Sequence, residues 1–128
     1  MSKENSCPAY SVETTLKVIT KRWSLQIMYD LFNGKKRFKE FKEDKPELLN
    51  KSLSRCLQEL EENDLIEKKI NSNDKNNTEY YLTDEGKSLK FVIYELIMYA
   101  INKDKNNQIF TEEEKKYLKV NAKRITEA

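Results

Sequence analysis

The two residues of this chain best suited to covalent chemistry are its cysteines, Cys7 and Cys56. A thiol reacts with oxidants and electrophiles as its thiolate, which nearby positive charge favours and apolar burial disfavours. Cys7 stands beside Pro8 near a basic segment, so it is either a reactive thiol or an inert apolar residue under the first helix. Cys56 falls on the apolar side of a predicted helix, and we expect it to pack in the core. A disulfide between Cys7 and the Cys56 of a second copy is a further alternative.

Other reactive groups are scarce, and this excludes most enzyme mechanisms. The chain has no histidine, so it has neither a Ser-His-Asp triad nor an imidazole metal site. Its two glycines, Gly34 and Gly86, cannot form a phosphate-binding glycine loop, and its cysteines lie 49 positions apart, so no C-x-x-C motif occurs. We therefore expect no catalytic residue, no metal ligand and no cofactor.

The overall composition is that of one small globular domain. The 128 residues include 24 basic and 22 acidic side chains, for a net charge of +2, and 38% are hydrophobic. This length fits one domain with a single core, and the balanced charge argues against a disordered polyelectrolyte. The sequence has no signal-peptide pattern and no apolar run of about 20 residues, so we expect no membrane partner and a cytoplasmic location.

Residues 50–63 indicate a different chemistry, the recognition of DNA. Leu53, Leu57 and Leu60 recur at helical spacing, and the opposite face is basic in its N-terminal half and acidic in its C-terminal half. Arginine can hold guanine through two hydrogen bonds, and hydroxyl groups can donate or accept at base edges. We expect groove contacts from this face, although a solvated helix surface is the simpler alternative. The candidates are Lys51, Ser52, Ser54 and Arg55.

Basic side chains are concentrated around this predicted helix. Residues 34–58 carry a net charge of +4, which leaves −2 for the rest of the chain. Positive charge gathered on one segment favours contact with phosphate. We expect Lys36, Arg37 and Lys39 to contact the DNA backbone, which sets register without reading sequence. Arg37 is equally suited to brace the fold through a carboxylate.

The order of predicted elements is that of a winged helix-turn-helix fold, mainly α-helical with a small β-hairpin. The second helix ends at Asn33-Gly34, and the two hairpin strands flank a polar tip at 71–77. In such folds the third core helix enters the major groove. We expect one domain over 1–128, with an N-terminal helix over 7–23, a helix-turn-helix core over 24–64, a wing hairpin over 65–82 and C-terminal dimerisation helices over 83–128.

The C-terminal region is too apolar to stay exposed. In residues 91–101, ten of eleven side chains are apolar or aromatic, and a helix that is apolar all round needs a partner surface. A capping box at Thr111–Glu114 opens a last helix, which either joins the dimer or folds back on its own subunit. We expect one long helix to start near Thr83 and to present to such a partner surface Val92, Ile93, Leu96, Ile97, Tyr99 and Ala100.

Short strings spread over residues 7–100 form an ordered pattern. They are Cys7-Pro8, Thr15–Ile19, Trp23, Lys36–Phe38, Glu40-Phe41, Lys51, Leu53, Leu57, Glu59–Glu61, Leu65-Ile66, Glu79-Tyr80, Leu82-Thr83 and Gly86. Together they resemble the HxlR-type winged-helix transcriptional regulators, relatives of the MarR group. The resemblance implies a homodimer that binds operator DNA, with terminal helices at the dimer interface. In several branches of this family a cysteine at the position of Cys7 senses oxidants or electrophiles.

The chain departs from the family pattern at three positions. Thr20-Lys21 replaces a Gly-Gly pair. Leu49 stands where a capping serine is expected, so we expect Asn50 to cap the helix one position later. Asn77 replaces the arginine that usually precedes the Glu-Tyr of the wing, which leaves Lys75 as the only cation of the wing tip, 71–77.

These observations predict a sequence-specific transcriptional regulator that binds double-stranded DNA as a homodimer on a near-palindromic operator. Its effector is expected to be an oxidant or electrophile acting at Cys7, or a small molecule in a pocket between the C-terminal helices. The alternative is a winged-helix module that binds proteins without specific DNA binding. Neither function is enzymatic.

Overall fold

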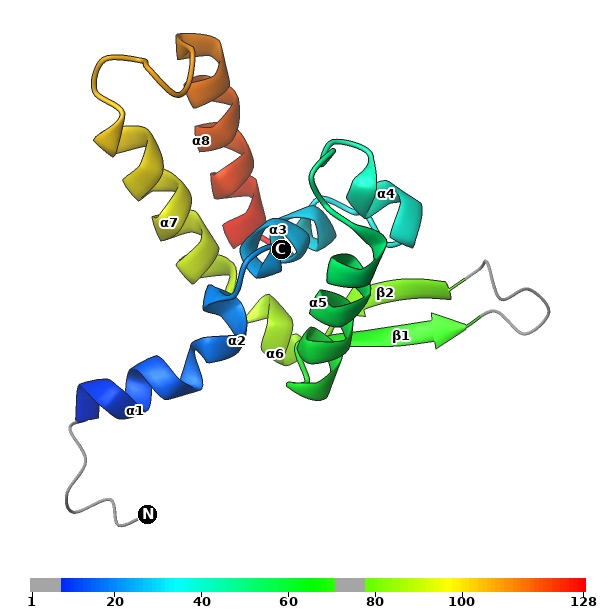
Figure 1. The fold of residues 1–128 in the computed structure, drawn as a ribbon. Coiled ribbons are helices and arrows are strands. Elements are labelled where there is room, and N and C mark those ends of the chain that lie inside the picture. The colour runs from blue at the N-terminus through cyan, green and yellow to red at the C-terminus, as the bar shows by residue number, and fades with distance from the viewer. Residues whose placement is uncertain (1–7, 71–77) are drawn as a thin grey trace.

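The computed structural model describes residues 8–70 and 78–128, which form short helices around a core, a two-stranded hairpin and a helical arm (Figure 1). The arm consists of the last two helices and extends away from the hairpin. In chain order the elements are α1 (Pro8–Thr15), α2 (Lys17–Thr20), α3 (Ser24–Phe32), α4 (Phe38–Lys42), α5 (Asn50–Glu62), β1 (Ile66–Ile70), β2 (Thr78–Leu82), α6 (Asp84–Lys87), α7 (Lys90–Lys103) and α8 (Glu112–Thr126).

The core lies where α3, α4, α5 and β1 meet. Met28 of α3, Phe41 of α4 and Leu53 of α5 are fully buried there, together with Ile66 of β1. Because the apolar residues of α5 recur on one side of the helix, its polar side stays at the surface. The element order and the small hairpin confirm the predicted winged helix-turn-helix fold.

The wing is the antiparallel pair of β1 and β2. Ile66 lies opposite Leu82 at its base, and Ile70 lies opposite Thr78 at its far end. The hairpin is present as the sequence predicts. The backbone N–H of Tyr80 donates to the carbonyl of Lys36 at 2.8 Å, which attaches the wing to the segment before α4. The tip, 71–77, with Lys75, lies outside the described residues.

The base of the wing explains why a glycine stands at position 86. The hydroxyl of Thr83 accepts from the N–H of Gly86 at 3.0 Å and caps α6, so the predicted helix start is confirmed. This cap brings Gly86 against β1, where an added Cβ would lie 2.1 Å from the carbonyl oxygen of Leu65. Any larger residue would therefore have to displace the backbone.

Two helices that the periodicity predicts as continuous are interrupted. The N-terminal segment divides into α1 and α2, and Trp23 then adopts a left-handed conformation with φ of 76° before α3 begins. The predicted long C-terminal helix divides into α6 and α7 at residues 88–89. Apolar spacing did not detect either break, because apolar residues continue on both sides of it.

The helix α5 begins without the expected side-chain cap. Leu49 occupies the cap position in an extended conformation, and its apolar side chain provides no capping hydrogen bond. Asn50 is already helical, so its predicted capping role is wrong. Its side-chain oxygen instead accepts a hydrogen bond from Lys42, which ties the start of α5 to α4.

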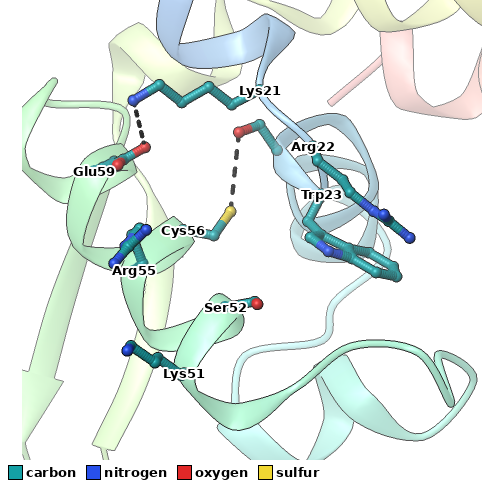
Figure 2. Close-up of a pocket in the computed structure, with 9 residues that line it drawn as sticks. Lys21, Arg22, Trp23, Lys51, Ser52, Arg55, Cys56 and Glu59 are labelled. Carbon is teal, nitrogen blue, oxygen red and sulfur yellow. Dashed lines mark hydrogen bonds and ion pairs between the residues drawn. The ribbon is translucent and has the colours of Figure 1, made fainter.

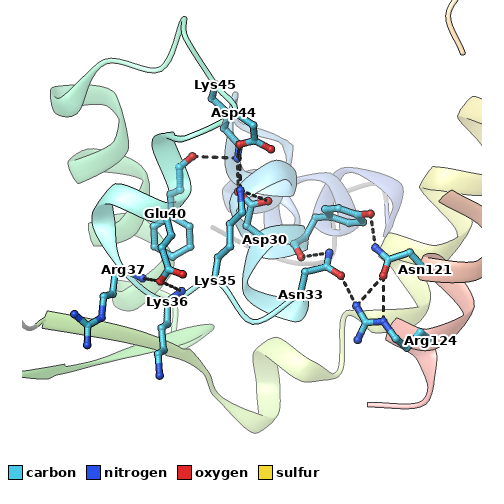
Figure 3. Close-up of polar contacts among 12 residues, drawn as sticks. Asp30, Asn33, Lys35, Lys36, Arg37, Glu40, Asp44, Lys45, Asn121 and Arg124 are labelled. Carbon is cyan, nitrogen blue, oxygen red and sulfur yellow. Dashed lines mark hydrogen bonds and ion pairs between the residues drawn. The ribbon is translucent and has the colours of Figure 1, made fainter. Parts of the chain in front are cut away.

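The last helix folds back on its own subunit. Helix α8 packs along α7, and Asn121 and Arg124 donate respectively to Tyr29 of α3 and to Asn33, which caps the end of α3 (Figure 3). At the α7–α8 turn, Asp104 accepts backbone N–H groups, including that of Phe110 at 2.9 Å. These donors hold the pKa of Asp104 below its usual value.

Candidate nucleic-acid interface

The exposed side of α5 carries the residues that the sequence singled out for groove contacts. Lys51, Ser54 and Arg55 are exposed, and Ser52 is half-buried. Neither Lys51 nor Arg55 has an ion-pair partner among residues 8–70 and 78–128. The N-terminal half of the helix therefore presents two uncompensated cations and two hydroxyl groups to solvent.

A hollow of about 420 Å³ lies beside this face (Figure 2). One wall is α5, and the other is the turn between α2 and α3. Figure 2 shows Lys21 reaching across to Glu59, while Arg22 and Trp23 lie together on the far side. The hollow is lined by Lys21, Arg22, Trp23, Ser24, Lys51, Ser52, Arg55, Cys56 and Glu59.

Lys36 and Arg37 contact a carboxylate of the wing. Their side-chain nitrogens lie 3.1 and 3.5 Å from Glu79, which also accepts from the hydroxyl of Tyr81 at 3.0 Å. The Lys36 ammonium and this hydroxyl hold the pKa of Glu79 below its usual value, and Glu79 raises the pKa of Lys36. Arg37 thus has the bracing contact that the sequence left open. Lys39 is exposed on α4.

Part of the positive charge of residues 34–58 is used inside the fold. Lys45 is buried and pairs with Asp30, while Asp44 lies 2.8 Å from Lys45 and 3.2 Å from Lys35 (Figure 3). A buried lysine requires such partners, because an isolated buried charge is costly. The uneven charge distribution of the sequence therefore overstates how much charge faces outward.

The two cysteines are in different situations. Cys56 is 6% exposed, and its Sγ lies 3.9 Å from the Oγ of Ser24. Burial raises the pKa of this thiol, which disfavours the reactive thiolate. Cys56 thus packs in the core, as expected. Cys7 lies outside the described residues.

The described residues contain neither a cluster of metal ligands nor a membrane-spanning helix. Across 8–70 and 78–128, no three histidine, cysteine or acidic side chains come together in a way that would hold a metal ion. In the same part of the chain, no helix has both the length and the apolar character needed to cross a bilayer.

The family of this chain follows from its match to a family model. The model for HxlR-like helix-turn-helix proteins matches residues 18–108, more than half of the chain. This protein belongs to the HxlR-like family. As an HxlR-like protein it is a helix-turn-helix transcriptional regulator and not an enzyme.

The chain is similar to two regulators of Bacillus subtilis (strain 168). It is 38% identical to YdeP over 87 residues, which cover 68% of this chain and 66% of YdeP, slightly under two thirds. It is 33% identical to YodB over 109 residues, which cover 85% of this chain and 96% of YodB. Both are described as HTH-type transcriptional regulators.

Solved structures of two regulators resemble this HxlR-like fold. The redox regulator HypR in its reduced form has a TM-score of 0.68 and 30% identity, covering 73% of this chain and 94% of HypR. Quinone-bound YodB from B. subtilis has a TM-score of 0.60 and 34% identity, covering 73% of this chain and 97% of that structure. This chain therefore has the same winged-helix fold as known regulators.

The predicted dimer residues of this HxlR-like chain are split between surface and core. On α7, Val92, Leu96 and Tyr99 are 39, 43 and 64% exposed and share one face, and Ala100 is exposed beside them. Ile97 is half-buried. Ile93 is only 4% exposed and belongs to the core of its own subunit, so its assignment to the interface was wrong.

The sequence did not single out the residues that face α5 across the hollow. Lys21 and Arg22 were read only as a departure from the family pattern and as neighbours of Trp23. Glu79 was read as a family-matching wing residue and not as the partner of two cations. The acids Glu59 and Glu47 pair with Lys21 and Arg22 at 3.0 and 3.3 Å. Only the three-dimensional arrangement joins these residues, because each pair is separated by more than 20 positions.

Proposed function

We propose that this protein binds operator DNA sequence-specifically as a homodimer, with the N-terminal half of α5 in the major groove. The observation that carries this proposal is that Lys51 and Arg55 are exposed and have no ion-pair partner within the described part of the chain, on a helix whose other side is held in the core. A helix supported in this way has a fixed backbone from which these side chains extend. The two α5 helices of a dimer would read half-sites about 34–36 Å apart on a near-palindromic operator.

Apolar surface on the outer helices supports the dimer. Helix α1 has no buried residue, although Val12 and Leu16 lie on it and beside it. Helix α7 exposes Leu96 and Tyr99, and isolated subunits rarely expose so many large apolar side chains on neighbouring elements. A second copy that covered α1 and α7 would remove this surface from water. The two wings would then lie on the outer sides of the dimer.

We also propose that Cys7 makes the regulator responsive to oxidants or electrophiles. Support comes from the similarity to HypR, described as a redox regulator, and to quinone-bound YodB. Cys56, the other cysteine of the chain, is buried and its pKa is raised, which makes it the poorer nucleophile. Because its partner is DNA, we place the protein in the cytoplasm.

An apolar hollow between α3 and the helical arm offers a second effector site. It has a volume of about 370 Å³ and is lined by Tyr29 of α3, Leu96 and Ile97 of α7, and Leu118 of α8, among others. Small-molecule sites are usually concave and mostly apolar, with a few polar groups. The same hollow adjoins the proposed dimer surface, so a molecule bound there would act on the relative position of the two subunits.

The test is a gel-shift titration with the DNA upstream of the gene that encodes the protein, repeated at two ionic strengths. We expect a specific shift whose affinity falls steeply as salt rises, since phosphate contacts release counterions. No specific shift on any genomic fragment would overturn the proposal and favour a protein-binding winged helix.

A further inference from the structure

The hollow beside α5 has a second basic wall to which no role has been given. Lys21 and Arg22 form it, opposite Lys51 and Arg55 of α5. These four cations are among the nine residues that line about 420 Å³ of space, and Glu59 is the one acid in that lining. A cavity with this charge favours an anion over a neutral or cationic group.

Both cations of this second wall are held in place. The Nζ of Lys21 lies 3.0 Å from Glu59 of α5, and the guanidinium of Arg22 lies 3.3 Å from Glu47 and 4.9 Å from the centre of the Trp23 ring. The left-handed turn at Trp23 fixes the backbone that carries them. A binding site gains from such pre-positioning, because less side-chain freedom is lost on binding.

The ion pairs that hold these cations are nevertheless open to exchange. The side chains of Lys21 and Arg22 are 53 and 73% exposed, and that of Glu47 is 79% exposed. Exposed ion pairs contribute little to stability, because water screens them. A phosphate can therefore approach both cations without first breaking a strong internal contact.

The position of this wall matches the geometry of a helix in a groove. In Figure 1, α2 and the wing lie on opposite sides of α5, so residues 21–22 lie on the side away from the wing. A helix in the major groove has a row of phosphates on each side. Lys36 contacts the wing through Glu79 on one side, which leaves the other row to the second wall.

We propose that the hollow receives a phosphate group of the DNA backbone, which Lys21 and Arg22 bind from the side opposite α5. This inference rests on the proposed function, because the duplex must bring its backbone alongside α5. It adds two backbone-positioning residues to the interface and implies that the α2–α3 turn helps to set the register of α5 in the groove.

The test measures binding of the full chain to a short duplex of arbitrary sequence by fluorescence anisotropy, between about 50 and 200 mM KCl. For wild type, log affinity should fall linearly with log salt. Lys21→Gln and Arg22→Gln should each weaken binding to this duplex and to operator DNA by the same factor. Each should also reduce the magnitude of the salt slope by about 1 for every subunit bound.

Two matched variants separate a phosphate contact from a structural role. Glu59→Gln and Glu47→Gln break the same ion pairs but keep Lys21 and Arg22. If the cations bind phosphate, these variants should bind the duplex as tightly as wild type or more tightly, because a competing carboxylate is gone. If they weaken binding as much as the lysine and arginine variants do, the ion pairs serve only the fold and the proposal is overturned.

Other outcomes are equally decisive. An unchanged salt slope in both Lys21→Gln and Arg22→Gln, with wild-type DNA binding intact, would overturn the phosphate site while leaving the proposed function in place. A wild-type protein that binds neither duplex would overturn the proposed function itself. Thermal unfolding of each variant provides the check that the fold is retained.

Discussion

Replacing Arg55 with alanine should weaken operator binding without weakening the fold. Arg55 is exposed on α5 and has no ion-pair partner among the described residues, so its removal should change the free energy of unfolding by no more than about 0.5 kcal/mol. A bidentate arginine–guanine contact contributes about 1–3 kcal/mol of discrimination. For one half-site this corresponds to a loss of roughly 5- to 150-fold in affinity. Two half-sites read by a dimer would double the change in free energy.

The assay compares binding to the operator fragment with binding to a shuffled duplex of the same length at the same salt. Arg55→Ala should lose affinity mainly for the operator, so the ratio of specific to non-specific affinity should fall. Lys119→Ala is the matched control, since it removes an exposed cation from α8, on the helical arm. An equal loss on both duplexes would mean that Arg55 contacts phosphate and not a base. No loss on either would remove Arg55 from the interface.

Four further predictions concern the effector, the dimer and the fold. Cys7→Ser should bind DNA normally in reducing buffer but lose any response to oxidant in a gel shift, and a wild type that ignores oxidants would refute the sensor. Leu96→Glu should dissociate the dimer in analytical ultracentrifugation, because it places charge on the apolar face of α7; an unchanged mass would exclude that face. Gly86→Ala should lower the free energy of unfolding in urea by about 1–3 kcal/mol, since its Cβ overlaps a backbone carbonyl; unchanged stability would mean that the carbonyl moves freely. The stability advantage of wild type over Asp104→Asn should be greatest at neutral pH and shrink as pH falls below about 4, because the folded state lowers the pKa of Asp104; a constant difference would contradict that.

The sequence alone was sufficient to predict those elements whose local pattern agrees with their tertiary packing. The leucines of α5 recur at helical spacing and all three are buried, and the strands of the wing match the predicted runs residue for residue. Thr83 and Thr111 cap helices as predicted, because a threonine cap depends only on nearby backbone. The signal in each case lies within one short segment.

The sequence failed where the deciding contact comes from a distant segment. Lys45 contributes to the positive charge that the sequence places on residues 34–58, but it is buried and pairs with Asp30, 15 positions away. Ile93 was assigned to the dimer because ten of the eleven residues in 91–101 are apolar or aromatic, and only the packing of α7 against the core separates inner from outer positions. Lys21 lies 3.0 Å from Glu59, which is 38 positions away. Periodicity contains no information about such pairs.

The most direct test of major-groove reading by α5 is methylation protection of guanine N7 on the operator, which probes the groove at single-base resolution. With saturating wild-type protein, we expect protected guanines in two clusters about one helical turn apart, and we expect Arg55→Ala to lose protection at specific guanines while still occupying the site. Full occupancy of the operator with no protected guanine in the major groove would contradict the placement of this helix on DNA.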